Sequence, residues 1–443
     1  MLSALPPLST KRLRPSKSCP ETQVLEPLFK KIRLIPSPLA TPEKQVSQLK
    51  RHLERRHRSC LRQITQEHPK DASFIELVDP LIYFARLLEI PGPTETPHSF
   101  ILGDADGSLG RMMLLAIQSG HFHLDDKGLS CLSDVLYEEF LQLGIPGSLY
   151  EWFHPAMKPM LNYYPLEFLM FKSFQSNGRV ALNFETILRH GTYSDASAKL
   201  IFLGDILHDR LSNHKSAMLS FIKNLHAHGA IFIKGNHDYG QVCLEFCEQR
   251  QTLVAKHVAF GRHCLDNGFT GENKDDIMQQ WMTFEKKYFQ NTFYDEDKKI
   301  FYIHNGFSTE SRPPFRENFL FTAFQLPFRS KTIHTPKELE KKLNYTRKDA
   351  APLKDFEKNH LTGFRPSELN IQQTLEGFFP QQGITCIHGH EGFATHEEKI
   401  IAYSAPKTES IVLNVNSRSK LNYQKNENEI LIKETHLPIA IRL

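Results

Sequence analysis

Residues 200–205, with the sequence LIFLGD, decide the fold class of this chain. Four apolar residues form the short run that is typical of a strand buried on both faces, and a Gly-Asp pair ends it. The same arrangement recurs along the chain. In order, the polar clusters that follow apolar runs are Gly103-Asp104-Ala105-Asp106-Gly107, Gly204-Asp205, Gly235-Asn236-His237-Asp238, His304-Asn305-Gly306 and Gly389-His390.

These clusters place carboxylate, amide and imidazole side chains at strand ends. In open α/β sheets the site lies beyond the carboxyl ends of the strands, so these residues should converge although they are far apart in sequence. Their oxygen and nitrogen atoms suit hard or borderline divalent ions. Two ions about 3.5 to 4 Å apart share a carboxylate and hold an attacking hydroxide. We therefore predict a two-metal centre in an α/β fold, with Asp205 as the candidate bridge.

The ordered series resembles the PPP-type protein phosphatases of the calcineurin-like phosphoesterase superfamily. Their blocks read GDxHG, GDxxDRG, GNHE, HGG and a late GH or RAH. Residues 399–406, KIIAYSAP, also resemble the strand and SAP turn of the protein phosphatase branch. The resemblance covers about residues 97–418 and implies a calcineurin-like metallophosphoesterase β-sandwich flanked by helices.

The resemblance also implies a role for each matching residue. It implies one ion held by Asp104, Asp106 and Asp205, and a second held by Asp205, Asn236, His304 and His390. His237 would protonate the leaving oxygen, since imidazole can donate a proton near neutral pH. Asp209 would orient His237, and Arg210 would bind the phosphate through its planar guanidinium.

Three positions depart from the family pattern. Asp106 stands where the family has His, and an anionic ligand shifts the preference toward harder ions, so we expect Mn²⁺, with Mg²⁺, Fe and Zn²⁺ as alternatives. The block at 204–210 has one extra residue between its two aspartates. Lys407-Thr408 follows the SAP turn where the branch has Asn-Tyr, so an expected active-site tyrosine is missing.

A rival interpretation starts from the first block. Residues 104–108, DADGS, resemble the DxDG(S/T) motif of haloacid-dehalogenase-type phosphatases, in which the first Asp is a nucleophile and Mg²⁺ is the cofactor. That interpretation leaves the later blocks unexplained, and no late Asp-Asp pair follows a strand. A structural alternative also stands, because Asp and Asn are common in the turns that end strands.

The composition of the chain indicates its partners and the cellular compartment in which it acts. The 443 residues carry a net charge of +4, which is too near balance for an obligate nucleic-acid partner. Seven cysteines without a CxxC pair favour a reducing compartment. The sequence has no apolar run of transmembrane length and no signal-peptide core. We expect a cytoplasmic enzyme. A resemblance to PPP-fold phosphatases that intracellular bacteria inject through type IV secretion implies the alternative, translocation into a host cell.

The motifs also define an organisation. We predict a disordered, basic, Pro-rich arm over 1–43, N-terminal helices over 44–95, a PPP-like domain over 96–418 and a tail over 419–443. Within the domain we expect a helical insertion over about 110–198, with helices at 132–143 and 165–174, and a second insertion over about 308–360. The helix predicted over 44–66 is basic and could contact an acidic partner or an anionic membrane; a solvated face is the alternative.

These observations predict a metal-dependent phosphomonoesterase that acts on phosphoproteins. Within enzymes, the alternative is a nucleotide or dinucleoside polyphosphate hydrolase. Outside enzymes, the alternative is an inert PPP-fold scaffold that binds a partner through its helical insertion, since variable segments on a rigid scaffold often carry specificity.

Overall fold

The computed structural model describes a defined subset of the chain. The described residues are 40–67, 80–92, 97–105, 107–143, 179–207, 215–235, 238, 274–307, 319–322, 325–329, 333–344, 367–390, 400, 409–415, 421–426, 429–434 and 440–443. The arm predicted over 1–43 lies outside them except for its last four residues. Within these ranges no helix combines the length and the apolar character of a membrane span.

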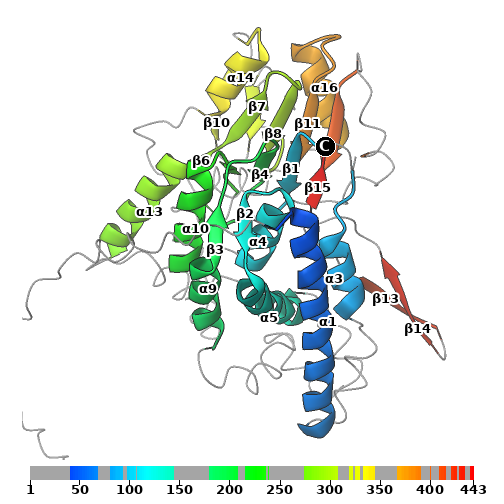
Figure 1. The fold of residues 1–443 in the computed structure, drawn as a ribbon. Helices are drawn as coiled ribbons and strands as arrows, with labels where there is room; N and C mark the ends of the chain where they lie inside the picture. The colour runs from blue at the N-terminus through cyan, green and yellow to red at the C-terminus, as the bar shows by residue number, and fades with distance from the viewer. Residues whose placement is uncertain are drawn as a thin grey trace, which may run out of the picture. The chain divides into compact units, whose positions relative to one another are not determined.

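The described chain contains helices interleaved with short strands (Figure 1). The helices are α1 (Pro42–Glu67), α3 (Pro80–Leu88), α4 (Leu109–Gln118), α5 (Asp126–Leu143), α9 (Arg179–Arg189), α10 (Lys215–Ala227), α13 (Lys274–Tyr288), α14 (Pro336–Leu343) and α16 (Glu368–Phe378). The strands are β1 (Ser99–Leu102), β2 (Phe122–Leu124), β3 (Gly191–Tyr193), β4 (Lys199–Phe202), β5 (Ile231–Ile233), β6 (Phe289–Gln290), β7 (Thr292–Asp295), β8 (Ile300–Ile303), β9 (Phe319–Thr322), β10 (Gln325–Arg329), β11 (Thr385–His388), β12 (Ile411–Asn414), β13 (Leu421–Asn426), β14 (Glu429–Glu434) and β15 (Ala440–Arg442).

Two sheets form the centre of the fold. The first has the order β15-β1-β4-β5-β6, with β15 antiparallel to β1 and the other pairs parallel. The second has the order β12-β11-β8-β7, with β7 antiparallel to β8 and the other pairs parallel. Both sheets therefore align the carboxyl ends of several strands along one edge, which is the arrangement that the polar clusters require.

The inner faces of the two sheets share one hydrophobic cluster. It contains Ile101, Ile201 and Ile233 from the first sheet and Tyr302, Ile387 and Leu413 from the second. Because alternate residues of a strand point to opposite faces, the neighbouring residues face outward. Leu102 and Phe202 pack with the residues of α4 and α10, whereas Phe301 and Cys386 pack with those of α14 and α16. Figure 1 shows these two helix groups on either side of the strands.

The predicted α/β class is confirmed, and so are two predicted helices. The helix predicted over 44–66 is α1, and the one predicted over 132–143 is the second part of α5. α5 and α9 both lie between β2 and β3, which pair with each other and so join the two ends of this segment. The helix predicted over 165–174 lies outside the described residues.

The tail predicted over 419–443 contains three of the described strands: β13 and β14 pair with each other as an antiparallel hairpin, and β15 joins the first sheet. β15 pairs with β1, with Ile441 opposite Ile101. The side chains of Ile441 and Leu443 are 0% and 2% exposed. The short apolar run at residues 440–443 thus completes one edge of the first sheet.

Ile441→Ala is expected to lower the free energy of unfolding by about 3 kcal/mol, because it leaves a cavity between the two sheets. Urea denaturation measures the change. Leu369→Ala is the matched control, since Leu369 is 59% exposed and should lose less than about 0.5 kcal/mol. Equal small losses in both variants would show that the carboxyl end does not belong to the core.

Polar contacts fix α1 on α5. His52 Nε2 lies 2.9 Å from Asp126 Oδ1, Arg56 Nε lies 3.0 Å from Asp134 Oδ1, and His57 Nδ1 lies 3.1 Å from the Tyr137 hydroxyl. The first and third contacts are hydrogen bonds and the second is an ion pair. Hydrogen bonds depend on distance and direction, so these contacts define the rotation of α1 about its axis. The opposite face of α1 is left to solvent.

Glu138 lies buried in this helix interface, and its protonation should control stability. Burial raises the pKa of its carboxyl to about 7; Arg56 opposes this shift, and Asp134 and Glu139 add to it. Between pH 4.5 and 7 the folded state holds a proton that the unfolded state releases, so the contribution of Glu138 to stability is greatest below pH 4.5 and falls as the pH rises to about 7.

Glu138→Gln removes this loss. The variant's advantage in unfolding free energy over the natural protein should be about 2 kcal/mol larger at pH 8 than at pH 5. Urea denaturation at both pH values measures the gain. Glu185→Gln on α9 is the control, because that side chain is 64% exposed and its variant should show no such pH-dependent difference. A gain of the same size in the control would contradict the assignment.

Candidate metal centre

Three of the residues predicted at strand ends form one buried cluster. Asp205 follows β4, His304 follows β8 and His390 follows β11, and each offers a ligand atom within 4.8 Å of those of the other two. Their exposed fractions are 4%, 0% and 5%. A carboxylate and two imidazoles that converge in a buried position supply the donor atoms of a borderline divalent ion.

Hydrogen bonding orients the imidazole of His304. Its Nδ1 lies 2.5 Å from the carbonyl oxygen of Leu203, which can only accept, so Nδ1 carries the proton. The lone pair of Nε2 then faces the centre, 3.5 Å from Asp205 Oδ1 and 3.1 Å from His390 Nδ1. A backbone carbonyl that fixes the tautomer in this way is the usual support of a metal-binding histidine.

Asp104 connects the first polar block to the last. Its Oδ1 accepts a hydrogen bond from the backbone N–H of His390 at 2.7 Å and lies 3.6 Å from His304 Nδ1. The carboxylate is buried, with 1% of the residue exposed. His390 needs this support because its φ of 77° lies in the left-handed region, which is unfavourable for residues other than glycine.

Glycines let the loops of the centre approach one another. A Cβ on Gly235 would overlap the backbone N and the Oδ1 of Asp205. Gly204 has a φ of 112°, and a Cβ there would overlap His304 Nδ1. A side chain at either position would therefore displace a candidate ligand, which explains physically why the Gly-Asp and Gly-Asn pairs occur in the sequence.

Asp238 is a buried carboxyl for which the sequence suggested no role. Its Oδ1 accepts hydrogen bonds from the N–H groups of Ile206 and Leu207 at 2.8 and 2.6 Å, and its Oδ2 accepts one from Gly235 at 2.8 Å. It thus ties the loop after β4 to the loop after β5. The sequence signal that could have identified Asp238 is its position as the fourth residue of the GNHD cluster.

The buried carboxyl of Asp238 interacts electrostatically with that of Asp205. Burial first, and the neighbouring Asp205 second, raise the pKa of the Asp238 carboxyl well above its usual value, while its three N–H donors oppose the rise. Adjacent buried carboxyls disfavour their common ionised state, and a cation would relieve that repulsion. The electrostatics and the donor set therefore both fit a divalent ion.

α13 holds the loop after β5 from the other side. Trp281 Nε1 donates to the carbonyl oxygen of Asp238 at 3.0 Å. Lys234, which precedes the loop, forms a buried ion pair with Glu285 of α13. Because both contacts come from one helix, they restrain both ends of residues 234–238.

His388 is a second buried polar residue near the centre. Burial lowers the pKa of its imidazole to about 4, so the ring is neutral at physiological pH. Its Nδ1 lies 3.0 Å from the Gly389 carbonyl oxygen and donates to it. This contact supports the turn that carries His390.

The other predicted site residues lie outside the described residues. These are Asp106, Asp209, Arg210, Asn236 and His237. They flank described positions, since Asp106 is two residues from Asp104, and Asn236 and His237 lie between Gly235 and Asp238. Their roles stay predictions.

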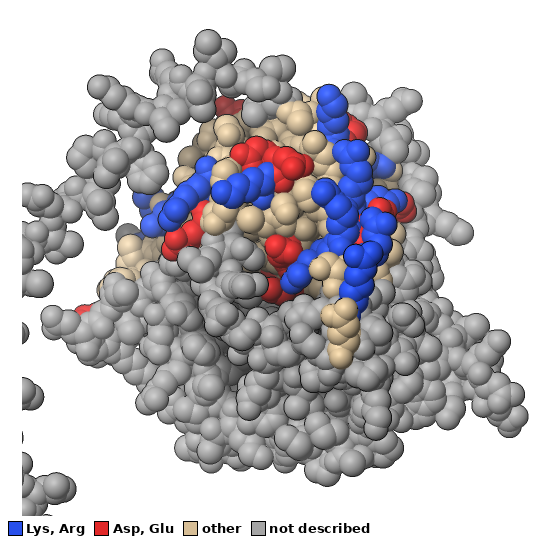
Figure 2. All heavy atoms as spheres, turned by 60° about the horizontal axis from the view of Figure 1, so that its bottom comes forward, with Lys and Arg blue, Asp and Glu red and all other residues tan. Residues whose placement is uncertain are grey.

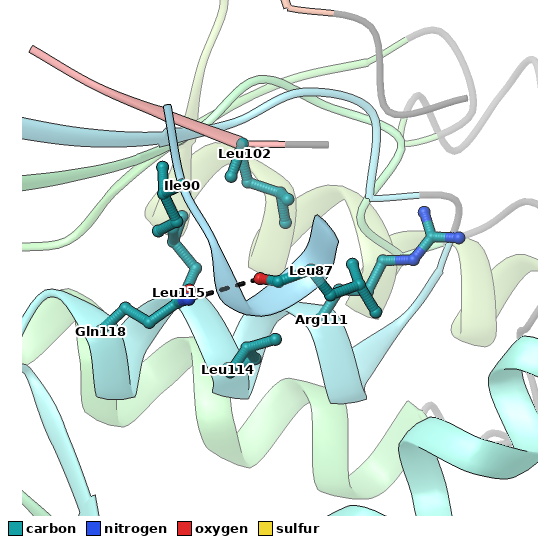
Figure 3. Close-up of a pocket in the computed structure, with 8 residues that line it drawn as sticks. Leu87, Ile90, Leu102, Arg111, Leu114, Leu115 and Gln118 are labelled. Carbon is teal, nitrogen blue, oxygen red and sulfur yellow. Dashed lines mark hydrogen bonds between the residues drawn. The ribbon is translucent and has the colours of Figure 1, made fainter. Parts of the chain in front are cut away.

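A pocket elsewhere is too small to compete with this centre. It lies among α3, α4 and β15, is lined by residues such as Leu87, Ile90 and Leu115, and has about 10 Å³ of free volume (Figure 3). Gln118 Nε2 donates to the Leu87 carbonyl oxygen at 3.3 Å beside it. A space of that size holds one water molecule at most.

The buried donor set could hold a divalent metal ion, and it lies within the part of the chain that a family profile matches. The sequence profile of the calcineurin-like phosphoesterase family matches residues 181–392, which include Asp205, His304 and His390. Residues 181–392 are therefore the part of the chain that is similar to calcineurin-like phosphoesterases. This family consists of metal-dependent hydrolases.

No curated protein matches the chain significantly. Among solved structures, the chain is similar to the phosphatase domain from the Legionella effector WipB, with 14% sequence identity and a TM-score of 0.30. The match covers 47% of this chain and 68% of that one.

Proposed function

We propose that this protein is a phosphoprotein phosphatase that uses two divalent ions, with Mn²⁺ as the expected metal. The observation that carries the proposal is the buried convergence of Asp205, His304 and His390 at strand ends, inside the segment that is similar to calcineurin-like phosphoesterases. The Asp104 carboxylate beside them fits the same use.

The proposal assigns two sets of ligands. One ion would be held by Asp104, Asp106 and Asp205, and the other by Asp205, Asn236, His304 and His390. When bound, the ions would supply Lewis-acid activation of water and of the phosphoryl group. The described residues support this assignment because the oriented Nε2 of His304 faces Asp205.

The remaining roles belong to side chains of the chain itself. His237 would give a proton to the leaving oxygen, with Asp209 orienting its ring. Arg210 would bind the phosphate oxygens and hold the ester against the centre. Asp238 is a positioning residue, since it holds the two loops that carry Asp205 and His237.

The preference for protein substrates rests on residues 399–406, which resemble the SAP stretch of the protein phosphatase branch. The segment with α5 and α9 offers a surface for a protein partner, because variable segments on a rigid scaffold often carry specificity. We place the enzyme in the cytoplasm of the cell that makes it, or, after translocation, in that of a host cell.

The test compares phosphate release from matched phosphoserine, phosphothreonine and phosphotyrosine peptides with release from nucleotides and dinucleoside polyphosphates. Each assay runs with metal-free protein and after addition of Mn²⁺, Mg²⁺ or Zn²⁺. We expect peptide hydrolysis that depends on Mn²⁺. Hydrolysis of nucleotides alone would replace the proposal with the nucleotide hydrolase. Bound metal without turnover of any ester would replace it with the inert scaffold.

A further inference from the structure

The outer face of α1 carries a row of cations. Its exposed members are Lys44, Lys50, Arg51, Arg55, Arg58 and Arg62. From Arg51 to Arg62 the spacing alternates between four and three residues, which places these side chains on one face of a helix. At 1.5 Å per residue, the row from Lys44 to Arg62 is about 27 Å long. Figure 2 shows Lys and Arg side chains gathered in a row at the place that α1 takes in Figure 1.

The fold holds this row in a fixed orientation. Leu49 and Leu53 are buried in the main core on the inner face of α1. Within the described ranges, the α1 side chains that pair with carboxylates are His52 and Arg56, which contact α5. The outward cations form no such pair among the described residues. The row therefore stands on a helix that is fixed to the core, and no ion pair among the described residues neutralises its cations.

The positive charge is local to one end of the chain. Residues 1–67 contain 14 Lys and Arg against five Glu and no Asp, a net charge of +9. Since the whole chain carries +4, the other residues carry a net −5. General basicity of the protein thus does not account for the row.

We infer that the outer face of α1 binds an anionic lipid bilayer and holds the phosphoesterase domain at a membrane surface. Clusters of four to eight Lys and Arg on one helix face are typical of electrostatic binding to anionic lipids. Arginine predominates in the row, and its guanidinium matches the oxygens of a phosphate headgroup in two parallel hydrogen bonds. Lipids diffuse freely and can meet each cation singly, so no preset spacing is needed.

The side chains between the cations disfavour other anionic partners. Among the α1 side chains that the structure describes, none of the exposed ones is apolar or aromatic; the neutral ones include Ser47 and Ser59. Protein interfaces gain most of their affinity from buried aromatic or apolar anchors. Proteins that bind single-stranded nucleic acid stack the bases on aromatic rings. A straight row of cations alone fits a flat, charged surface.

The test measures co-sedimentation of the full chain with vesicles of phosphatidylcholine containing about 30 mol % phosphatidylserine, at about 0.15 M salt. The row variant is Arg51→Gln, Arg55→Gln and Arg58→Gln combined. Each cation near such a surface contributes about fivefold to the partition coefficient, so the variant should bind about 100-fold more weakly. The natural protein should not bind vesicles of phosphatidylcholine alone.

A control variant separates the row from net charge. Arg189→Gln, Lys286→Gln and Lys341→Gln remove three exposed cations from α9, α13 and α14, and should leave binding unchanged. Equal weakening of both variants, or no binding by the natural protein, would overturn the inference. Preference for duplex DNA over vesicles, lost in the row variant, would also overturn it and assign the row to nucleic acid.

Two readouts keep the result independent of folding and of the proposed activity. Thermal midpoints should agree among the natural protein and both variants, since the altered side chains are exposed. Hydrolysis of a soluble phosphate ester should be unchanged as well, because none of these residues belongs to the metal centre. If the ester is not hydrolysed at all, the proposed function fails while the vesicle result still decides the membrane inference.

Discussion

Asp205→Asn is expected to reduce metal-dependent phosphate release at least about 1,000-fold, which corresponds to about 4 kcal/mol of transition-state stabilisation. The carboxylate of Asp205 is the proposed bridge between the two ions, and an amide cannot replace its charge. Its Oδ1 lies 3.5 Å from His304 Nε2 in the centre. Metal bound per protein, measured by elemental analysis after desalting, should fall together with activity.

The choice of asparagine separates a loss of metal from a loss of fold. Asp205 has a φ of 52°, and Asn tolerates the left-handed region better than Ala does. The substitution also removes a negative charge beside Asp238, so the thermal midpoint of the metal-free protein should not fall. Asp195→Asn is the matched control, since its carboxylate is 89% exposed. Full activity with normal metal content in Asp205→Asn would exclude the proposed bridge.

Asp238→Ala is expected to lower the free energy of unfolding by about 3 kcal/mol or more and to abolish activity. The substitution leaves three buried N–H groups, those of Ile206, Leu207 and Gly235, without their acceptor. A buried donor that loses its partner costs about 1 to 3 kcal/mol. Urea denaturation measures the stability, and release of phosphate measures the activity.

Two further variants test this explanation. Asp238→Asn keeps one acceptor oxygen but turns an amide N–H₂ toward a backbone donor, so it should be intermediate in stability. Asp195→Ala removes an exposed carboxylate and should cost less than about 1 kcal/mol. If Asp238→Ala were as stable as this control, the loops after β4 and β5 would not depend on the Asp238 carboxyl.

The strands and the polar residues at their ends could be predicted from the sequence, because both patterns involve residues that are adjacent in the chain. Three consecutive apolar residues in β4 and four in β8 reflect burial on both faces, and the loops that follow these strands supply candidate ligands. Gly204 and Gly235 were readable for the same reason, since the close approach of the loops excludes any side chain there.

The contacts of Asp238 and the strand β15 could not be predicted in this way. The part of Asp238 depends on three N–H groups from two loops, and no local pattern states which donors a carboxyl will meet. The four residues from Ala440 to Leu443 are too few to identify as a strand beside a polar, Glu-containing segment. They become one because β1 offers a free edge about 340 residues earlier in the chain.

The α/β class, the polar blocks and their chemistry follow from the amino-acid sequence, because each depends on residues that are neighbours along the chain. Three contacts depend instead on how distant segments pack: the hydrogen bond from His304 Nδ1 to the Leu203 carbonyl oxygen, the support of His390 by Asp104, and the outward direction of the α1 cations. The physical reason is that contacts between distant segments arise from the packing of the two sheets and their helices, and local pattern does not encode that geometry.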